Sequence, residues 1–321
     1  MNIQSLWQSE NHSAFTDLCY ANGSWYCVFR EGTTHMSLDG KIIVLKSMDA
    51  KLWRQHSEMS WQGGDLRDPK LSVSPGGVLI LSAGIRWAVY NTRKSRLYSV
   101  GWHLKENGDW SAPVLDQTSE GSWRWAPTWH KGTAYSVGYG AEDIQGCLYE
   151  SKDGLHWQAV LKPFFPDTGV FTNESTLVSD NETLWCLSRR DAAGGAKAIL
   201  GKAILTNATR WLKNWQWQTV SKAIGGPKLI KLSNGEWLLA ARRINYKRWS
   251  AKTVLYKLNP KSGRLKVWRE LPSAGDSSYA GMVEKEGKLY ISYYSCHLNG
   301  QSNIFLAVIA LIKTKRSRTF L

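Results

Sequence analysis

The sequence predicts an all-β fold, a six-bladed β-propeller formed by a single domain that spans residues 1–321. Three observations lead to this prediction. A segment pattern recurs at a nearly constant interval, a turn residue lies at the centre of each copy, and the composition is rich in strand-forming aromatic residues and in glycine, with 18 Trp, 13 Tyr and 28 Gly. No helical period of convincing length competes with this pattern.

Each copy of the repeat consists of a short apolar strand, a turn and a second apolar strand. The turns are centred on Gly23, Gly77, Gly132, Asn181, Gly235 and Gly287, at successive intervals of 54, 55, 49, 54 and 52 residues. Apolar residues alternate on both sides of each turn, as in a β-hairpin, and a unit of about 50 residues suits a four-stranded blade. Six such units occupy the chain and leave no room for a second domain.

The two ends of the chain are expected to close the ring. The opening segment SLWQSE is predicted to pair with the last blade, whose third strand is expected at Ile304–Ile312. Such pairing leaves no exposed sheet edge. The basic residues at 313–321 are expected to form a short solvated tail.

Charge and cysteine content limit the classes of function. The formal net charge of +15 favours an anionic partner, such as an acidic carbohydrate, a nucleic acid or a membrane surface. The first residues lack the basic start and apolar stretch of a secretory signal, and no later stretch approaches the length of a membrane span, so a soluble, cytoplasmic protein is expected. The five cysteines are scattered without a CxxC pair, so neither a disulfide framework nor a metal site is indicated, and no cofactor is expected.

Polar residues recur at equivalent ends of the repeat hairpins, where a propeller brings side chains from different blades together at one end of its axis. Near the start of the first strands stand Asp17, Asp68, Arg124, Glu174 and Tyr279, and near the end of the second strands stand Arg30, Arg189 and Arg242. Guanidinium groups bind carboxylates through two parallel hydrogen bonds, so these arginines are candidates for binding an acidic substrate. The alternative is that they pair with structural carboxylates on neighbouring loops.

Strings such as SKDGLHW at 151–157 and SMDAKLW at 47–53 lie between the hairpins. They resemble the Asp-box turns of sialidases and related propellers, in which Asp accepts backbone N–H groups, Gly has a positive φ and Trp packs between sheets. Together with the six repeats, they make the chain similar to the sialidase (neuraminidase) superfamily, and in particular to bacterial exo-α-sialidase-like proteins. The resemblance covers nearly the whole chain.

This resemblance implies roles for individual residues. NESTLV with Glu174 and LSRR with Arg189 look like the segment that supplies a Glu and a carboxylate-binding Arg, and GDSSYAGMV looks like the segment that supplies the Tyr nucleophile, Tyr279. In sialidases the Glu polarises this Tyr, and a phenol avoids the repulsion that a carboxylate nucleophile would meet from the substrate carboxylate. Asp68, preceded by Arg67, resembles the position that contacts substituents of the sugar.

Three departures from the family pattern affect the predicted site. The first arginine of the carboxylate-binding triad is missing, since the corresponding stretch reads Ala14-Phe15-Thr16-Asp17. No Asp follows Arg30 at the position of the family's acid/base, so His35 is the candidate proton donor, with Asp17 and Asp68 as alternatives. The last hairpin ends in a histidine, His297, which is an additional candidate for substrate binding.

The sequence therefore predicts a glycoside hydrolase of sialidase type that acts on an acidic sugar without a metal. A polysaccharide lyase acting on uronates, with Tyr279 or a His as the base, is the second hypothesis. A glycan-binding propeller without catalysis is the third. Nucleic-acid binding is disfavoured because no recognised nucleic-acid-binding motif is present.

Overall fold

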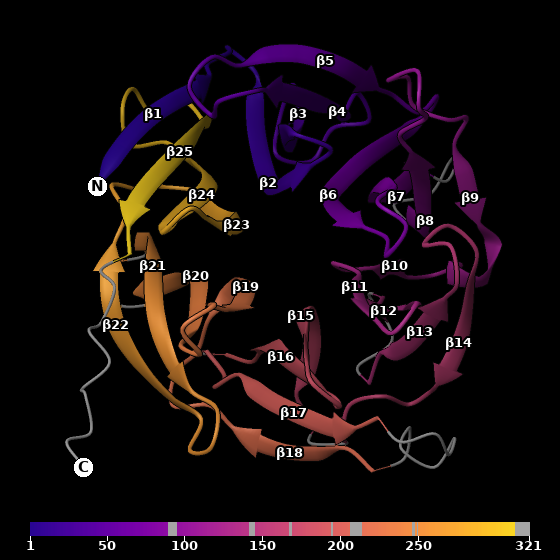
Figure 1. Cartoon of the computed structure of the whole chain (residues 1–321), viewed down its shortest axis with the longest axis vertical. Helices are drawn as coiled ribbons and strands as arrows, with labels where there is room; N and C mark the ends of the chain where they lie inside the picture. Colours follow the sequence, from indigo (N-terminus) through magenta and orange to yellow (C-terminus); the bar gives the residue numbers. More distant parts are fainter. Residues whose placement is uncertain are drawn as a thin grey trace, which may run out of the picture.

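The computed structural model describes residues 1–88, 95–140, 145–166, 169–193, 195–205, 214–245, 248 and 250–311. Within these ranges six antiparallel sheets surround a common axis (Figure 1), which confirms the predicted six-bladed β-propeller. The predicted basic tail at 313–321 lies outside the described residues.

The first three blades are formed by residues 12–161. Blade 1 contains β2 (His12–Ala21), β3 (Ser24–Gly32), β4 (Lys41–Ser47) and β5 (Arg54–Met59). Blade 2 contains β6 (Gly64–Val73), β7 (Leu79–Ala88), β8 (Ser95–His103) and β9 (Val114–Asp116), followed by the 3-10 turn η1 (Gln117–Ser119). Blade 3 contains β10 (Trp123–Arg124), β11 (Thr128–His130), β12 (Thr133–Tyr139), β13 (Cys147–Ser151) and β14 (Trp157–Leu161).

The other three blades continue the ring and return to the N-terminus. Blade 4 contains β15 (Phe171–Asp180), β16 (Thr183–Asp191), β17 (Ile199–Ile204) and β18 (Gln216–Thr219). Blade 5 contains β19 (Gly225–Lys231), β20 (Trp237–Asn245), β21 (Ser250–Asn259) and β22 (Arg264–Glu270). Blade 6 contains β23 (Ser277–Lys285), β24 (Lys288–Ser295), β25 (Asn303–Ala310) and the N-terminal strand β1 (Asn2–Trp7).

Each predicted hairpin forms the inner part of a blade. All six turn residues have a positive φ, from 51° at Asn181 to 87° at Gly235, a backbone region that glycine and asparagine adopt at low cost. The innermost strands β2, β6, β15, β19 and β23 face the axis, with the second strand of each hairpin outside them (Figure 1).

The predicted ring closure is also present, but the N-terminal strand begins and ends three residues before the predicted segment SLWQSE. Strand β1 pairs antiparallel with β25, with Asn2 opposite Val308 and Ser5 opposite Phe305. Figure 1 shows the indigo N-terminal strand beside the yellow β25. Because the last blade takes its outer strand from the start of the chain, the ring is held together by the two ends of the sequence.

The hydrophobic core lies between neighbouring blades. Val28 and Val44 of blade 1 pack in one cluster with Leu81 and Val100 of blade 2, and equivalent clusters fill other blade interfaces. Alternating apolar side chains on both faces of each sheet supply this packing. The arrangement leaves the inner strand ends to carry polar side chains.

A β-bulge recurs near the start of five innermost strands, which the sequence repeat did not reveal. The pairing register shifts between Ala14 and Asp17, Arg67 and Lys70, Thr172 and Ser175, Gly225 and Lys228, and Ser278 and Gly281. In blade 3 the inner strand is interrupted between β10 and β11, where Pro127 has no N–H for pairing. Bulges redirect side chains and are frequent next to functional sites.

Candidate active site at the axis

The bulges bring a tyrosine of blade 6 against a glutamate of blade 4. Tyr279 lies in the bulge of β23 with a φ of 47°, and its hydroxyl donates a short hydrogen bond to Glu174 Oε1. Gly226 of blade 5 lies between them and donates its N–H to Glu174 Oε2 at 2.6 Å. A Cβ atom on Gly226 would lie 2.8 Å from the Tyr279 ring, so only glycine lets the tyrosine reach the carboxylate.

Arg189 completes this contact. Its Nη1 donates to Glu174 Oε1 at 2.8 Å and to the Tyr279 hydroxyl at 3.2 Å, and its Nε donates to Asp191 at 2.9 Å. Burial alone would raise the pKa of Glu174, but Arg189 and the hydrogen bonds from Tyr279 and Gly226 hold that pKa below its usual value. Burial, together with the Glu174 charge, raises the pKa of Tyr279 strongly. The pair is therefore an ionised carboxylate and a neutral phenol.

Arg242 lies on the other side of the tyrosine. Its Cζ is 4.9 Å from the centre of the Tyr279 ring, while Nη2 donates to Asp276 Oδ1 and to the Tyr294 hydroxyl, both at 2.7 Å. Its Nε donates to the Ser277 carbonyl at 2.7 Å. A cation over a phenol ring face is attracted to it and stabilises negative charge that develops on the oxygen. Glu174, Tyr279, Arg189, Arg242 and Asp276 are called the axial cluster below.

Two histidines border the axial cluster. His35 Nδ1 lies 2.8 Å and His12 Nε2 lies 3.2 Å from the same oxygen, Asp276 Oδ2. The His35 side chain is 49% exposed, whereas the Tyr279 residue is 7% exposed, so the histidine faces solvent and the tyrosine lies beneath it. Among the described residues, His12, His35 and Asp276 offer three possible metal-ligand atoms that lie within 4.8 Å of one another.

Aromatic side chains pack around Tyr279. Phe15, in the bulge of β2, has its ring centre 5.2 Å from that of Tyr279 and 5.3 Å from that of His35. Trp125 lies 6.1 Å from Tyr279 on the blade 3 side. Such rings provide an apolar surface against which a sugar ring packs.

Asp68 lies in the bulge of β6, close to this group. It has a φ of 50°, and its carboxyl is largely buried near Arg67, Lys70 and Glu174. Burial raises the pKa of Asp68, and the two cations only partly oppose this shift. Asp68 is therefore more readily protonated than an exposed aspartate.

The structure brings most of the predicted residues together. Glu174, Tyr279 and Arg189 are in mutual contact, Arg242 contacts the Tyr279 ring, and His35 borders this group through Phe15 and Asp276. Arg67 Nη1 donates to the His35 carbonyl at 2.7 Å and so holds the loop that carries this histidine. The catalytic and substrate-binding roles of these residues remain predictions.

Arg30 and Arg124 do not serve the predicted role in substrate binding. Arg30 is 0% exposed, its Nε donates to Asp65 at 2.6 Å, and its other nitrogens donate to Thr34 and Ser37. Arg124 is buried in an ion pair with Asp116 and stacks on the ring of Trp157. Both guanidinium groups are thus occupied by structural partners between blades, which corrects the prediction made from strand position.

Asp17 and His297 also lie away from the predicted role. Asp17 is fully buried, accepts a hydrogen bond from Lys228 Nζ at 2.8 Å and another from the Leu71 N–H at 3.0 Å, so it joins three blades below the axial cluster. His297 contacts Ser295 and the ring of Phe305, and within the described residues no contact joins it to the axial cluster. Neither residue is placed to bind substrate or to donate a proton to it.

Several residues of the site were not predicted from the sequence. Asp276, His12, Tyr294 and Asp191 contact the axial cluster or its arginines but were not selected. Asp276 lies three positions before Tyr279 in the segment GDSSYAGMV, and His12 opens the first inner strand. A search that also covered polar residues at the first position of each inner strand and immediately before it would have found these two.

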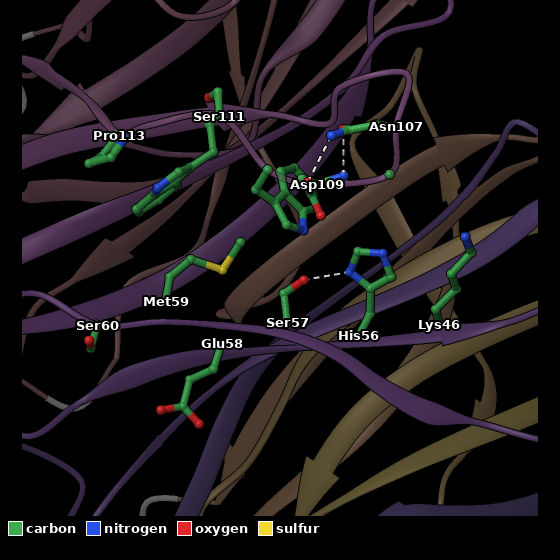
Figure 2. Close-up of a pocket in the computed structure, with 13 residues that line it drawn as sticks. Lys46, His56, Ser57, Glu58, Met59, Ser60, Asn107, Asp109, Ser111 and Pro113 are labelled. Carbon is green, nitrogen blue, oxygen red and sulfur yellow. Dashed lines mark hydrogen bonds between the residues drawn. The ribbon is translucent and has the colours of Figure 1, made fainter.

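A separate surface groove lies away from the axis. It has a volume of about 730 Å³ between β5 and the loop that joins β8 to β9, and Lys46, His56, Trp110 and Asp109 are among its lining residues (Figure 2). In Figure 2 the His56 ring points to Ser57, and Asn107 and Asp109 bond to each other. None of the residues predicted for function lines this groove, so the axial cluster is the candidate active site.

No protein-family model and no curated protein matches the sequence. Solved structures do match its fold. A protein of unknown function from Dyadobacter fermentans aligns with a TM-score of 0.81 and 17% identity, over 97% of this chain and 98% of that one. Trypanosoma rangeli sialidase, in complex with the inhibitor DANA, aligns with a TM-score of 0.64 and 12% identity over 92% of this chain. The fold is that of the sialidase-like six-bladed β-propellers.

Other glycosidases share this sialidase-like fold. The α-L-arabinofuranosidase Arb93a from Fusarium graminearum aligns with a TM-score of 0.68 and 12% identity, over 93% of each chain. The sialidase-like propeller described here spans 55% of the length of the trypanosomal sialidase. At these identities the comparisons establish the fold.

The described residues include no helix of the length and apolar character that a membrane crossing requires.

Proposed function

We propose that this protein is a glycoside hydrolase that acts on an acidic sugar and uses Tyr279 as its nucleophile. The observation that carries the proposal is the contact of the Tyr279 hydroxyl with Glu174 and Arg189 at the propeller axis. Sialidases and an arabinofuranosidase are among the solved structures with this fold, which supports a glycosidase as the class of enzyme.

The geometry supports a covalent mechanism. The phenol oxygen attacks the anomeric carbon while its proton moves to Glu174, which is ionised and already accepts the hydrogen bond. A tyrosyl–glycosyl intermediate forms and the leaving group departs with a proton from a second residue. Water then attacks the anomeric carbon and gives a proton back to that second residue, while Glu174 returns its proton to the phenolate as it leaves. Arg189 and Arg242 stabilise the charge on the phenol oxygen during both steps.

The two arginines also support an anionic substrate. Within the described residues, Arg189 Nη2 and Arg242 Nη1 have no hydrogen-bond partner, whereas the other nitrogens of both groups do. Their side chains are 20% and 15% exposed, so these nitrogens are available to a ligand. A carboxylate on the carbon that Tyr279 attacks would lie within reach of both groups.

A panel of matched substrates tests this specificity. We expect the kcat/KM for sialosides or uronides to exceed that for their carboxyl methyl esters by about 10- to 100-fold, because a hydrogen bond between charged groups contributes about 1.5–3 kcal/mol. Released sugar would be measured together with unsaturated uronate. Equal rates for acid and ester would contradict the acidic substrate, and an unsaturated product would identify a lyase.

His35 is the proposed donor of the proton to the leaving group. Its Nδ1 faces Asp276, so the opposite ring nitrogen, Nε2, is left for the substrate. We expect His35→Ala to slow glycosides with poor leaving groups by about 100-fold or more and activated aryl glycosides far less, because the latter need little protonation. Equal slowing of both substrates would assign proton donation elsewhere, with Asp68 as the next residue to replace.

One observation favours a second candidate, hydrolysis of a neutral sugar. Phe15 occupies the stretch where the sialidase pattern predicts an arginine, and its ring packs on Tyr279. Arg189 and Arg242 also already face Glu174, Asp191 and Asp276. Preference for the uncharged members of the same substrate panel would support this candidate.

A further inference from the structure

Three segments far apart in the sequence meet at one carboxylate oxygen. His12 begins β2, His35 lies in the loop after β3, and Asp276 lies just before β23, yet both imidazoles reach Asp276 Oδ2. The two rings are in edge contact, with centres 5.1 Å apart. Two imidazole rings thus share a single carboxylate oxygen, and only one of them, His35, has a role in the proposed reaction.

The other oxygen of Asp276 fixes the carboxylate in place. Oδ1 accepts from Arg242 Nη2 at 2.7 Å and from the Tyr294 hydroxyl at 2.8 Å. Burial by itself would raise the pKa of Asp276, but the hydrogen bonds from both histidines and the charge of Arg242 hold it well below its usual value. Asp276 therefore remains ionised throughout the pH range in which a histidine titrates, and it accepts a proton from each imidazole N–H.

The two histidines differ in the surroundings of their second ring nitrogens. Within the described residues, Nδ1 of His12 is buried and has no hydrogen-bond partner, so a proton there would be a buried N–H without an acceptor. His35 is 49% exposed and no described residue bonds to its Nε2, so a proton on that nitrogen is solvated. The second nitrogen of His12 thus has no acceptor for an N–H, whereas the second nitrogen of His35 is open to solvent and to a substrate.

His35 is held from two directions. Arg67 fixes its carbonyl and Asp276 fixes its Nδ1, while the ring lies 5.3 Å from Phe15, which in turn contacts Tyr279. The charged and titratable groups that face it are Asp276, His12 and Arg67, with Arg242 and Tyr294 behind the carboxylate and Tyr279 beyond Phe15. A carboxylate at Nδ1 selects the tautomer with Nε2 directed away from it, as in the catalytic triads of hydrolases.

We propose that Asp276 and His12 are positioning residues that make His35 the proton donor of the site. Asp276 orients the His35 ring and stabilises its protonated form, and His12 holds Asp276 Oδ2 toward His35. Because Asp276 also binds Arg242, the same carboxylate aligns the proton donor with an arginine that contacts the nucleophile. This inference rests on the proposed function and deepens it.

The alternative occupant of this site is a divalent cation, since imidazole nitrogens and a carboxylate oxygen are metal ligands. Two features oppose it. The Arg242 guanidinium already bonds to the same carboxylate, and Nδ1 of His12 lacks the acceptor that a metal-bound histidine normally has for its second nitrogen.

The test compares Asp276→Asn with the wild-type chain on two substrates of the same sugar, one with a poor leaving group and one with an activated aryl group, across pH. We expect kcat/KM for the poor leaving group to fall by about 100-fold or more, and that for the aryl glycoside by far less. The high-pH limb of the profile is expected to move to lower pH, because the variant loses the negative charge that faces the protonated imidazole at 2.8 Å. His156→Ala, which removes an exposed histidine in a distant turn, is the matched control and should change neither quantity.

His12 provides an independent measurement that does not disturb Arg242. His12→Ala is expected to reduce turnover of the poor leaving group selectively, and His12→Gln, whose amide still donates to Asp276, should recover most of that loss. Equal slowing of both substrates by Asp276→Asn with an unshifted pH profile, or no difference between the two His12 variants, would overturn the inference. If Asp276→Asn does not fold, the His12 pair decides.

Zinc titration by calorimetry distinguishes the metal alternative. One-to-one binding that Asp276→Asn abolishes, together with activity that chelation removes and zinc restores, would overturn the proton-donor assignment. The proposed function would fail in a different way, since then no glycoside would be cleaved or Tyr279→Phe would have no effect.

Discussion

Replacing Tyr279 by phenylalanine is expected to lower kcat by at least about 1,000-fold, because the variant retains the ring but lacks the oxygen that forms the covalent intermediate. Its stability should change by no more than about 1 kcal/mol. Glu174 would still accept hydrogen bonds from Arg189 and Gly226, so the buried carboxylate is not left without partners. Steady-state kinetics and urea denaturation measure the two quantities.

Tyr293→Phe is the matched control for this experiment. Tyr293 is also fully buried and donates one hydrogen bond, to the Pro272 carbonyl at 3.2 Å, but it lies outside the axial cluster. It should lose a similar amount of stability and retain its turnover. Unchanged turnover in Tyr279→Phe would exclude the nucleophile role and leave a binding protein or a different mechanism.

Asp65→Asn is expected to destabilise the fold by about 3 kcal/mol or more, because it leaves the buried Arg30 charge without its carboxylate. Both side chains of this pair are 0% exposed, and the same carboxylate also pairs with Arg67 at 3.0 Å. Asparagine has nearly the same shape, so the loss reports the missing charge rather than a cavity. Urea denaturation of the full chain measures the change in the free energy of unfolding.

The exposed pair between Lys131 and Glu182 is the control for this prediction, since its side chains are 64% and 56% exposed. Glu182→Gln should leave the free energy of unfolding unchanged within error, because solvent screens such pairs. A loss below about 1 kcal/mol in Asp65→Asn would show that Arg30 finds other partners or water, and that its burial does not depend on this carboxylate.

Tyr279 and Asp65 are the partners of arginines that occupy equivalent positions in the sequence repeat but have different surroundings in the structure. Arg30, Arg189 and Arg242 all lie near the end of the second strand of a hairpin, so the local pattern predicted one role for them. In the structure Arg30 is buried in an ion pair with Asp65 of the next blade. Arg189 and Arg242 instead contact Tyr279, and their side chains are partly exposed. The partners that distinguish these arginines belong to other blades, so the residues that flank each arginine in the sequence do not reveal its role.

The sequence alone determined the fold, because its evidence is local. Alternating apolar residues, turn residues with positive φ and a constant repeat length specify hairpins and blades over windows of a few tens of residues. The pairing of β1 with β25 also followed from the need to close the ring. Glu174, Arg189 and Tyr279 were selected because each lies in a segment with a recognisable pattern.

Which charged groups meet depends on how the blades are arranged in space. His12 and Asp276 are 264 residues apart, and Tyr279 and Glu174 are 105 apart, so their contacts depend on the order and angle of the blades around the axis. The β-bulges that turn Phe15, Asp68 and Tyr279 out of the regular alternation are likewise absent from the two-residue period of the strands. Strand periodicity assigns a side chain to a face of its own sheet, whereas hydrogen bonds and ion pairs between blades depend on positions that no single segment contains.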